Sequence, residues 1–86
     1  MFRDRIHEAK VNDIVNRVGD HIYRTRMQQG KTQEDISRET QQSLAGFANI
    51  ERARVRNPGI FTIEKILNSL GYTLKIAKLE TDKKKK

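Results

Sequence analysis

Apolar residues recur at spacings of three and four along the first third of the chain, as they do on one face of an α-helix. The residues that set this pattern are Val11, Ile14, Val15, Val18 and Ile22. The pattern predicts an amphipathic helix over about residues 12–29. Gly30 is placed to end it, since helices commonly stop at a residue whose left-handed conformation suits glycine.

Two short helices are predicted next. Thr32 can cap the first, which carries acidic residues in its opening turn, where the helix dipole favours negative charge. Ile36 is its main apolar residue, and it ends near Glu39. After a break at residues 40–42, Ser43 can cap the second, which ends near residue 52 or 53.

In the last third of the chain, the spacing of the apolar residues changes from a helical period to an alternating one. A turn is predicted at residues 57–59, and a fourth helical stripe, closed by Gly71, is formed by Ile60, Ile63, Ile66, Leu67 and Leu70. Tyr72, Leu74 and Ile76 then alternate with polar or small residues, which predicts a strand over residues 72–79.

The predicted fold is therefore mainly α: a small bundle of four or more helices with one C-terminal β-strand. A lone strand exposes unpaired backbone groups, and nothing else in the chain reads as its partner. We therefore expect it to pair with its copy in a homodimer, through the dimerisation residues Tyr72, Leu74 and Ile76. The chain divides into an N-terminal extension (1–11), one domain (12–80) and a basic tail (81–86) predicted to be disordered.

Composition limits the function classes. The 86 residues include no cysteine and only 35% hydrophobic residues, so one small domain must rely on packing alone, which suits the cytoplasm. No stretch is apolar and long enough to span a membrane, and no signal peptide is apparent. Of the net charge of +7, the four lysines at 83–86 supply +4, which leaves +3 for the rest.

Catalytic chemistry has little support. The two histidines, His7 and His21, have no cysteines to complete a metal site, and the spacing of the acidic residues at 34–39 is explained by capping and solvation. No glycine-rich phosphate loop or nucleophile elbow is present. We expect no enzyme, no metal and no cofactor.

The second short helix has an unusual outer face. Phe47 and Ile50 point inward, with Leu44 at their margin. At about 100° per residue, the opposite face is small and polar, and it is formed by Ala45, Ala48, Asn49 and Arg52. Such a face suits the major groove of DNA, because alanine can touch thymine methyl groups and asparagine can pair with adenine. The helix before it would cross the phosphates, which Gln33 could bind through its side-chain amide or its backbone N–H.

A basic cluster follows this helix. Arg52, Arg54 and Arg56 lie at and beyond its end, so they are expected to contact DNA phosphates and not bases. A solvated loop is the alternative interpretation. The lysine tail has two similar interpretations, a solubilising tail or a nucleic-acid arm.

Residues 18–76 resemble the Cro and phage-repressor class of helix-turn-helix proteins, the XRE family. The resemblance runs without gaps through VGDHIYRTRMQQGKTQEDIS, FANIER and NPGIFTIEKILNSLG. It implies that Gln33 and Ser43 contact phosphates, that Leu44, Ala45 and Asn49 face bases, and that a dimer binds a pseudo-palindromic operator in double-stranded DNA.

The turn between the two short helices departs from the family. Thr40 and Gln42 stand where apolar residues are usual, and glycine is usual at Gln41 and Ala53, while Ser37 replaces an alanine. A left-handed residue other than glycine costs roughly 1 kcal/mol, so a looser or differently shaped turn is expected.

The segment KILNSLGYTLKIAKL further resembles the HipB-type antitoxins, which dimerise through such a strand and bind a HipA-like kinase toxin. That resemblance implies an autoregulating repressor in a toxin-antitoxin operon, associated with the nucleoid. Three alternatives stay open: a phage or mobile-element repressor, a HigA-like antitoxin, and an adaptor that uses the same fold to bind a protein.

Overall fold

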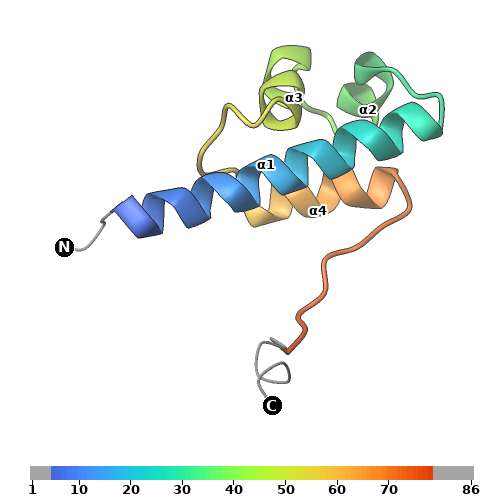
Figure 1. The fold of residues 1–86 in the computed structure, drawn as a ribbon. Helices are drawn as coiled ribbons and strands as arrows, with labels where there is room; N and C mark the ends of the chain where they lie inside the picture. The colour runs from blue at the N-terminus through green and yellow to red at the C-terminus, as the bar shows by residue number, and fades with distance from the viewer. Residues whose placement is uncertain (1–4, 79–86) are drawn as a thin grey trace.

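The computed structural model describes residues 5–78, with side chains from residue 12 onward (Figure 1). Within that range the chain forms four helices: α1 (Arg5–Gln28), α2 (Gln33–Glu39), α3 (Leu44–Glu51) and α4 (Ile60–Ser69). The mainly α fold predicted from the sequence is confirmed. α1 begins at Arg5, earlier than the start near residue 12 that the sequence pattern predicted, so residues 5–11 are helical. The predicted basic tail at 81–86 lies outside the described residues.

All four helices end in a Schellman motif, in which a left-handed residue follows the C-cap and the next N–H bonds back to a carbonyl. The left-handed residues are Gly30 (φ 69°), Gln41 (φ 59°), Ala53 (φ 60°) and Gly71 (φ 91°). The returning bonds are 2.8 to 3.1 Å long and join Lys31 to Arg26, Gln42 to Ser37, Arg54 to Asn49, and Tyr72 to Leu67. The predicted stops at Gly30 and Gly71 are thus confirmed.

The first helix of the pair α2 and α3 begins with a capping box. The Thr32 hydroxyl accepts from the backbone N–H of Asp35 at 3.0 Å, and the Asp35 carboxylate accepts from the backbone N–H of Thr32 at 2.9 Å. These contacts with Thr32, backbone first and then side chain, lower the pKa of Asp35 below its ordinary value of 3.8. Two otherwise unpaired helix N–H groups are satisfied in this way.

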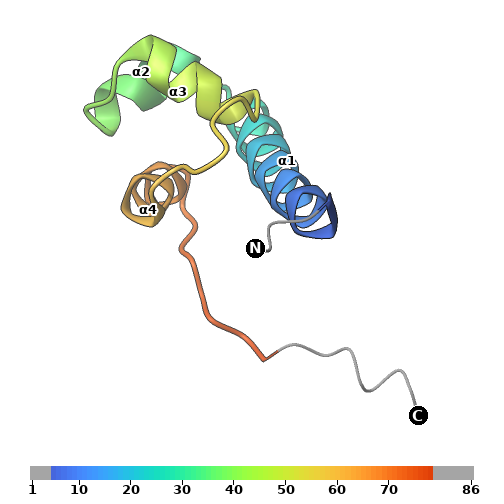
Figure 2. The ribbon, with the colours of Figure 1, turned by 90° about the vertical axis from the view of Figure 1, so that its left-hand side faces the viewer.

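The core lies where the four helices meet. α2 and α3 sit together on one side of α1, and α4 runs beside α1 below them (Figures 1 and 2). The fully buried side chains are Phe47, Ile22, Ile36 and Ile66, and Ile50, Ile63, Leu67 and Leu70 complete the cluster. Ile60, which the sequence placed in the apolar stripe of this helix, is 74% exposed at the first position of α4.

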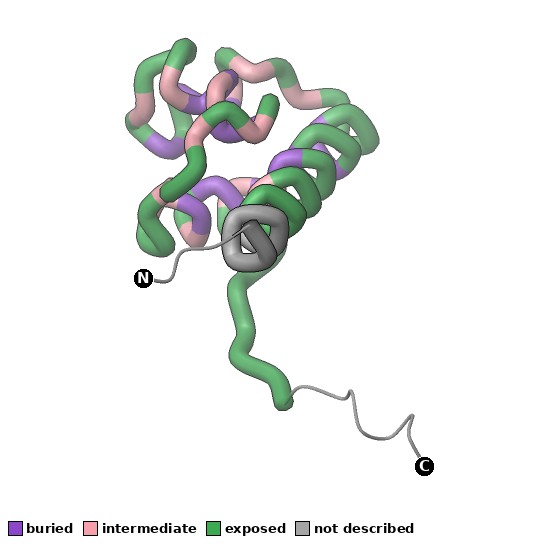
Figure 3. Tube along the Cα trace, turned by 60° about the vertical axis from the view of Figure 1, so that its left-hand side comes forward, coloured by how far each residue is buried: buried purple, intermediate pink, exposed green. Residues whose placement is uncertain are grey.

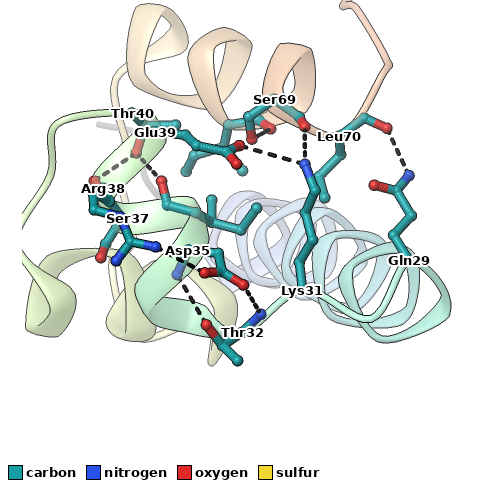
Figure 4. Close-up of polar contacts among 12 residues, drawn as sticks. Gln29, Lys31, Thr32, Asp35, Ser37, Arg38, Glu39, Thr40, Ser69 and Leu70 are labelled. Atoms are coloured by element: carbon teal, nitrogen blue, oxygen red, sulfur yellow. Dashed lines mark hydrogen bonds and ion pairs between the residues drawn. The ribbon is translucent and has the colours of Figure 1, made fainter.

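Polar side chains fasten the end of α4 to the rest of the bundle (Figure 4). Lys31 donates to the carbonyl of Ser69 at 2.9 Å and lies 3.4 Å from the Glu39 carboxylate, while Gln29 donates to the carbonyl of Leu70 at 2.8 Å. Helix ends leave carbonyls without partners, and a cation beside them also offsets the helix dipole. The turn between α1 and α2 therefore holds α4 in place.

α1 approaches the end of α3 at Gly19. A Cβ atom at this position would lie 2.6 Å from the backbone oxygen of Glu51 and 3.1 Å from that of Ile50, closer than van der Waals contact allows. Only glycine permits this approach, so Gly19 sets the distance between α1 and the C-terminal end of α3.

Residues 72–78, the C-terminal arm, leave α4 as a drawn-out exposed segment (Figures 1 and 3). No strand occurs in residues 5–78, because a β-ladder needs a second strand and none of the described residues provides it. Ile76, one of the expected dimerisation residues, is fully exposed in the single chain. The last residue of the predicted strand lies outside the described residues.

Candidate nucleic-acid interface

α3 presents a small polar surface to solvent. Ala45 and Arg52 are exposed and Asn49 is half-buried, and these three share one side of the helix. Phe47 and Ile50 point the other way, into the core, as predicted. Leu44 is 43% exposed at the first position of the helix, beside this surface. The face has the size and chemistry that the major groove accepts.

Ala48 is not part of this surface. It is only 8% exposed, so its predicted place on the outer face is wrong. At 100° per residue Ala48 lies about 60° from Glu51, which is also buried, and this puts it at the edge of the inward arc. The exposed face of α3 is therefore narrower than the sequence pattern indicated.

Ser43 caps α3. Its hydroxyl accepts from the backbone N–H of Gly46 at 2.9 Å, as the sequence predicts. A Cβ atom at Gly46 would lie 2.9 Å from that hydroxyl oxygen, so glycine leaves room for the cap. The hydroxyl proton of Ser43 remains able to donate to a phosphate in addition.

The three arginines after α3 are all exposed. Arg52 is the C-cap, and Arg54 and Arg56 lie in the following loop on either side of Val55. Val55 packs against the core cluster, so it anchors the loop and leaves the two neighbouring guanidinium groups on the outside. The sequence pattern did not single out Val55. The structure thus brings a basic loop next to the exposed face of α3.

Gln33 lies at the start of α2, as expected, but its side chain has another partner. Its amide nitrogen donates to the Glu51 carboxylate at 2.6 Å. The amide oxygen and the backbone N–H at the helix start are the groups that can meet DNA. Gln33 therefore links α2 to the end of α3.

The centre of this link is an ion pair that the sequence interpretation missed. Arg26 of α1 donates to Glu51 through two nitrogens, at 2.7 and 3.0 Å, and to the carbonyl of Lys31 at 2.9 Å. The Arg26 and Glu51 side chains are 8% and 3% exposed. The Arg26 guanidinium also lies 5.6 Å from the ring centre of Tyr23, within cation-π range. This ion-pair network fixes α3 relative to α1 and α2.

One signal for Arg26 was present in the sequence. Arg26 follows Ile22 by four residues, which continues the apolar stripe of α1 inward. A charged residue at such a position needs a buried partner, and Glu51, next to the inward Ile50, is in the same situation on α3.

The atypical turn keeps a well-formed geometry. Gln41 adopts the left-handed conformation, so the expected loosening is not seen. The buried Thr40 hydroxyl donates to the carbonyl of Ile36 at 2.8 Å and lies 3.0 Å from the side-chain oxygen of the half-buried Gln42. Ser37, also buried, donates to the carbonyl of Glu34 at 3.0 Å. Local hydrogen bonds thus satisfy the polar side chains that stand at usually apolar positions.

Within residues 5–78, neither a metal-binding cluster nor a membrane-spanning helix accompanies this surface. The described residues hold no group of three or more histidine, cysteine or acidic side chains placed to bind a metal ion. Among the helices in residues 5–78, none has the combination of length and apolarity that crossing a bilayer requires.

Comparison with known proteins agrees with this geometry. A family model described as helix-turn-helix matches residues 22–83, which is most of the chain and includes α2, the turn and α3. Comparison with curated proteins and with solved structures gives no significant match.

Proposed function

Because the chain belongs to the XRE-type helix-turn-helix family and so carries a DNA-binding domain of transcription regulators, we propose that it is a sequence-specific repressor. It binds a pseudo-palindromic operator as a homodimer and reads base edges with α3. The observation that carries this proposal is the exposed face of α3 (Ala45, Asn49 and Arg52) beside the basic loop of Arg54 and Arg56.

Each part of the proposed interface has a chemical role. Asn49 offers a donor and an acceptor to adenine, and Ala45 and Leu44 supply apolar contact to thymine methyl groups. The arginines bind phosphates, which positions the domain without reading sequence. In a dimer, the two copies of α3 enter major grooves about one helical turn apart.

Asn49→Ala tests the reading surface. A preferred site is first selected from a random duplex pool, and affinity is then measured by fluorescence anisotropy at fixed salt. Asn49→Ala should weaken binding to this site by about 1 to 3 kcal/mol and remove discrimination at one base position. Asn68→Ala on α4 is the matched control and should keep that discrimination. If the Asn49 variant still discriminates at every position, α3 does not read bases in this orientation.

The basic loop is tested by salt dependence. Replacing one of Arg52, Arg54 or Arg56 by glutamine should weaken binding to the selected site and to random DNA alike. It should also lower the slope of log K against log salt by about one. Lys65→Gln, at an exposed position on α4, should leave the slope unchanged. If all four variants gave the same slope, the three arginines would not contact phosphates, and the loop would simply be solvated.

The C-terminal arm supports a finer proposal, that the repressor is the antitoxin of a toxin-antitoxin operon, acting in the cytoplasm on its own promoter. The arm exposes apolar side chains beyond the helical bundle, at Tyr72, Leu74 and Ile76. Co-expression with the product of an adjacent kinase-like reading frame should give a complex of defined stoichiometry. If no such reading frame adjoins the gene, the phage or mobile-element repressor becomes the better assignment.

A further inference from the structure

One edge of the C-terminal arm is already occupied by its own helical bundle. The Glu64 carboxylate on α4 accepts from the backbone N–H of Leu74 at 2.8 Å and from the Thr73 hydroxyl at 2.8 Å. These two donors, the backbone N–H first, lower the pKa of Glu64 below its ordinary value of 4.5. Along an extended chain, backbone groups of alternate residues point to opposite edges. The N–H groups of even-numbered residues therefore face α4, and the free edge belongs to residues 73, 75 and 77.

Two of the even-numbered side chains, those of Tyr72 and Leu74, lie toward the bundle. The Tyr72 ring packs edge-on against His21 of α1, with ring centres 4.8 Å apart. Leu74 lines an apolar groove of about 330 Å³ between α1 and α4, which also includes Ile14, Val18 and Ile60. Ile14 is 53% exposed and Ile76 is fully exposed, so both leave apolar surface in contact with solvent in the single chain.

We propose that the arm pairs through its free edge with the arm of a second copy, antiparallel, in a register that sets Leu74 opposite its own counterpart. This inference rests on the proposed homodimer and specifies its interface. In that register the other cross-strand pairs are Tyr72 with Ile76 and Thr73 with Lys75. The Leu74 N–H then points away from the second strand, as its bond to Glu64 requires.

The neighbouring registers are less favourable. Only shifts that keep odd residues opposite odd residues use the free edge. A register centred on Lys75 would set the two Lys75 side chains opposite each other, and like charges in that position destabilise a sheet. A centre at residue 76 would set Leu74 opposite Lys78.

A centre at residue 73 fails for another reason: it would set Ile76 opposite Leu70, which is already buried in its own bundle. The register centred on Leu74 pairs an aromatic with a β-branched side chain, a favourable combination. It also directs the apolar side chains of the second arm to the same face as the groove, which covers Leu74 and Ile14.

Cysteine cross-linking tests the register, and the chain has no cysteine of its own to interfere. Leu74→Cys alone should form a linked dimer under mild oxidation, because directly opposed residues of this kind lie about 4.5 Å apart between Cα atoms, within disulfide range. A mixture of Thr73→Cys and Lys75→Cys should link to each other. Either of these two variants alone should give little linked dimer. Non-reducing gel electrophoresis reads each result.

Two outcomes would overturn the proposed register. Self-linking of Lys75→Cys in preference to Leu74→Cys would place the two-fold axis at residue 75. Absence of linking in every variant, while sedimentation shows a dimer, would place the dimer interface elsewhere and leave the proposed repressor intact. A monomer by sedimentation at concentrations that bind the selected DNA site would instead refute the homodimer itself. Glu64→Ala provides a further readout, since loss of the carboxylate should reduce linking between Thr73→Cys and Lys75→Cys.

Discussion

Removing one partner of the buried ion pair between Arg26 and Glu51 should destabilise the domain more than any exposed substitution. Arg26→Met leaves the Glu51 carboxylate without its two short guanidinium contacts, in a site where the side chain is only 3% exposed. Such a loss costs about 3 to 5 kcal/mol, because a buried charge is left uncompensated. A domain of this size has a total stability of roughly 4 to 13 kcal/mol, so one substitution removes a large part of it.

The double variant separates this pair from other effects. Arg26→Met together with Glu51→Leu leaves no buried charge without a partner. The double variant should therefore lose clearly less stability than the sum of the losses in the two single variants. Full recovery is not expected, since Gln33 loses its acceptor and the Lys31 carbonyl loses its donor. We expect a coupling energy of about 2 kcal/mol or more from the double-mutant cycle.

The exposed pair between Arg17 and Asp13 is the control. It joins the same kinds of atoms at 3.2 Å, but the two side chains are 71% and 65% exposed. Its cycle should give about 0.2 to 1 kcal/mol. Urea unfolding followed by circular dichroism at one fixed protein concentration measures all variants. If the buried and exposed cycles gave equal coupling, the ion-pair network would not be what fixes α3 against α1.

Three further predictions follow from local geometry. Gly19→Ala should destabilise the domain by about 1 to 3 kcal/mol, because the added Cβ would overlap a backbone carbonyl of α3. Thermal or urea unfolding measures this loss. An unchanged unfolding midpoint would mean that α1 and α3 can move apart at no cost. Gln41→Gly and Ala53→Gly should each stabilise by about 0.5 to 1 kcal/mol, since both residues are left-handed, whereas loss of stability would show that their side chains matter more than their backbone. The capping box at Asp35 should stabilise α2 fully above the unfolded pKa of 3.8 and fail as pH falls through the lower folded pKa; a pH titration of unfolding should lose this dependence in Asp35→Asn.

The regular parts of this fold were predictable because their signals are local. The spacing of Ile22, Ile36, Phe47 and Ile66 gave the helices and the core, and Gly30 and Gly71 gave two of the helix ends. Periodicity averages over a helix, however, and cannot place a residue at the margin of a face. For this reason Ala48 was assigned outward although it is buried.

Contacts between distant residues were the part that periodicity could not supply. Arg26 and Glu51 are 25 residues apart, so periodicity can place each at an inward position of its own helix but cannot show that the two side chains pair. Gly19 carries no side chain, and only the position of the α3 backbone shows why glycine is required there. The alternating pattern of the C-terminal arm indicates a strand, but the second strand that it needs does not occur in residues 5–78.

The two strained residues Gln41 and Ala53 border α3 without belonging to its exposed face. Substitutions that alter the bases read by a recognition helix often reduce stability, and a marginally stable domain tolerates few of them. Glycine at these two flanking positions would supply a reserve of about 1 to 2 kcal/mol without touching Ala45, Asn49 or Arg52. The chain therefore offers a route to altered operator specificity in which the stabilising changes and the reading changes lie at separate positions.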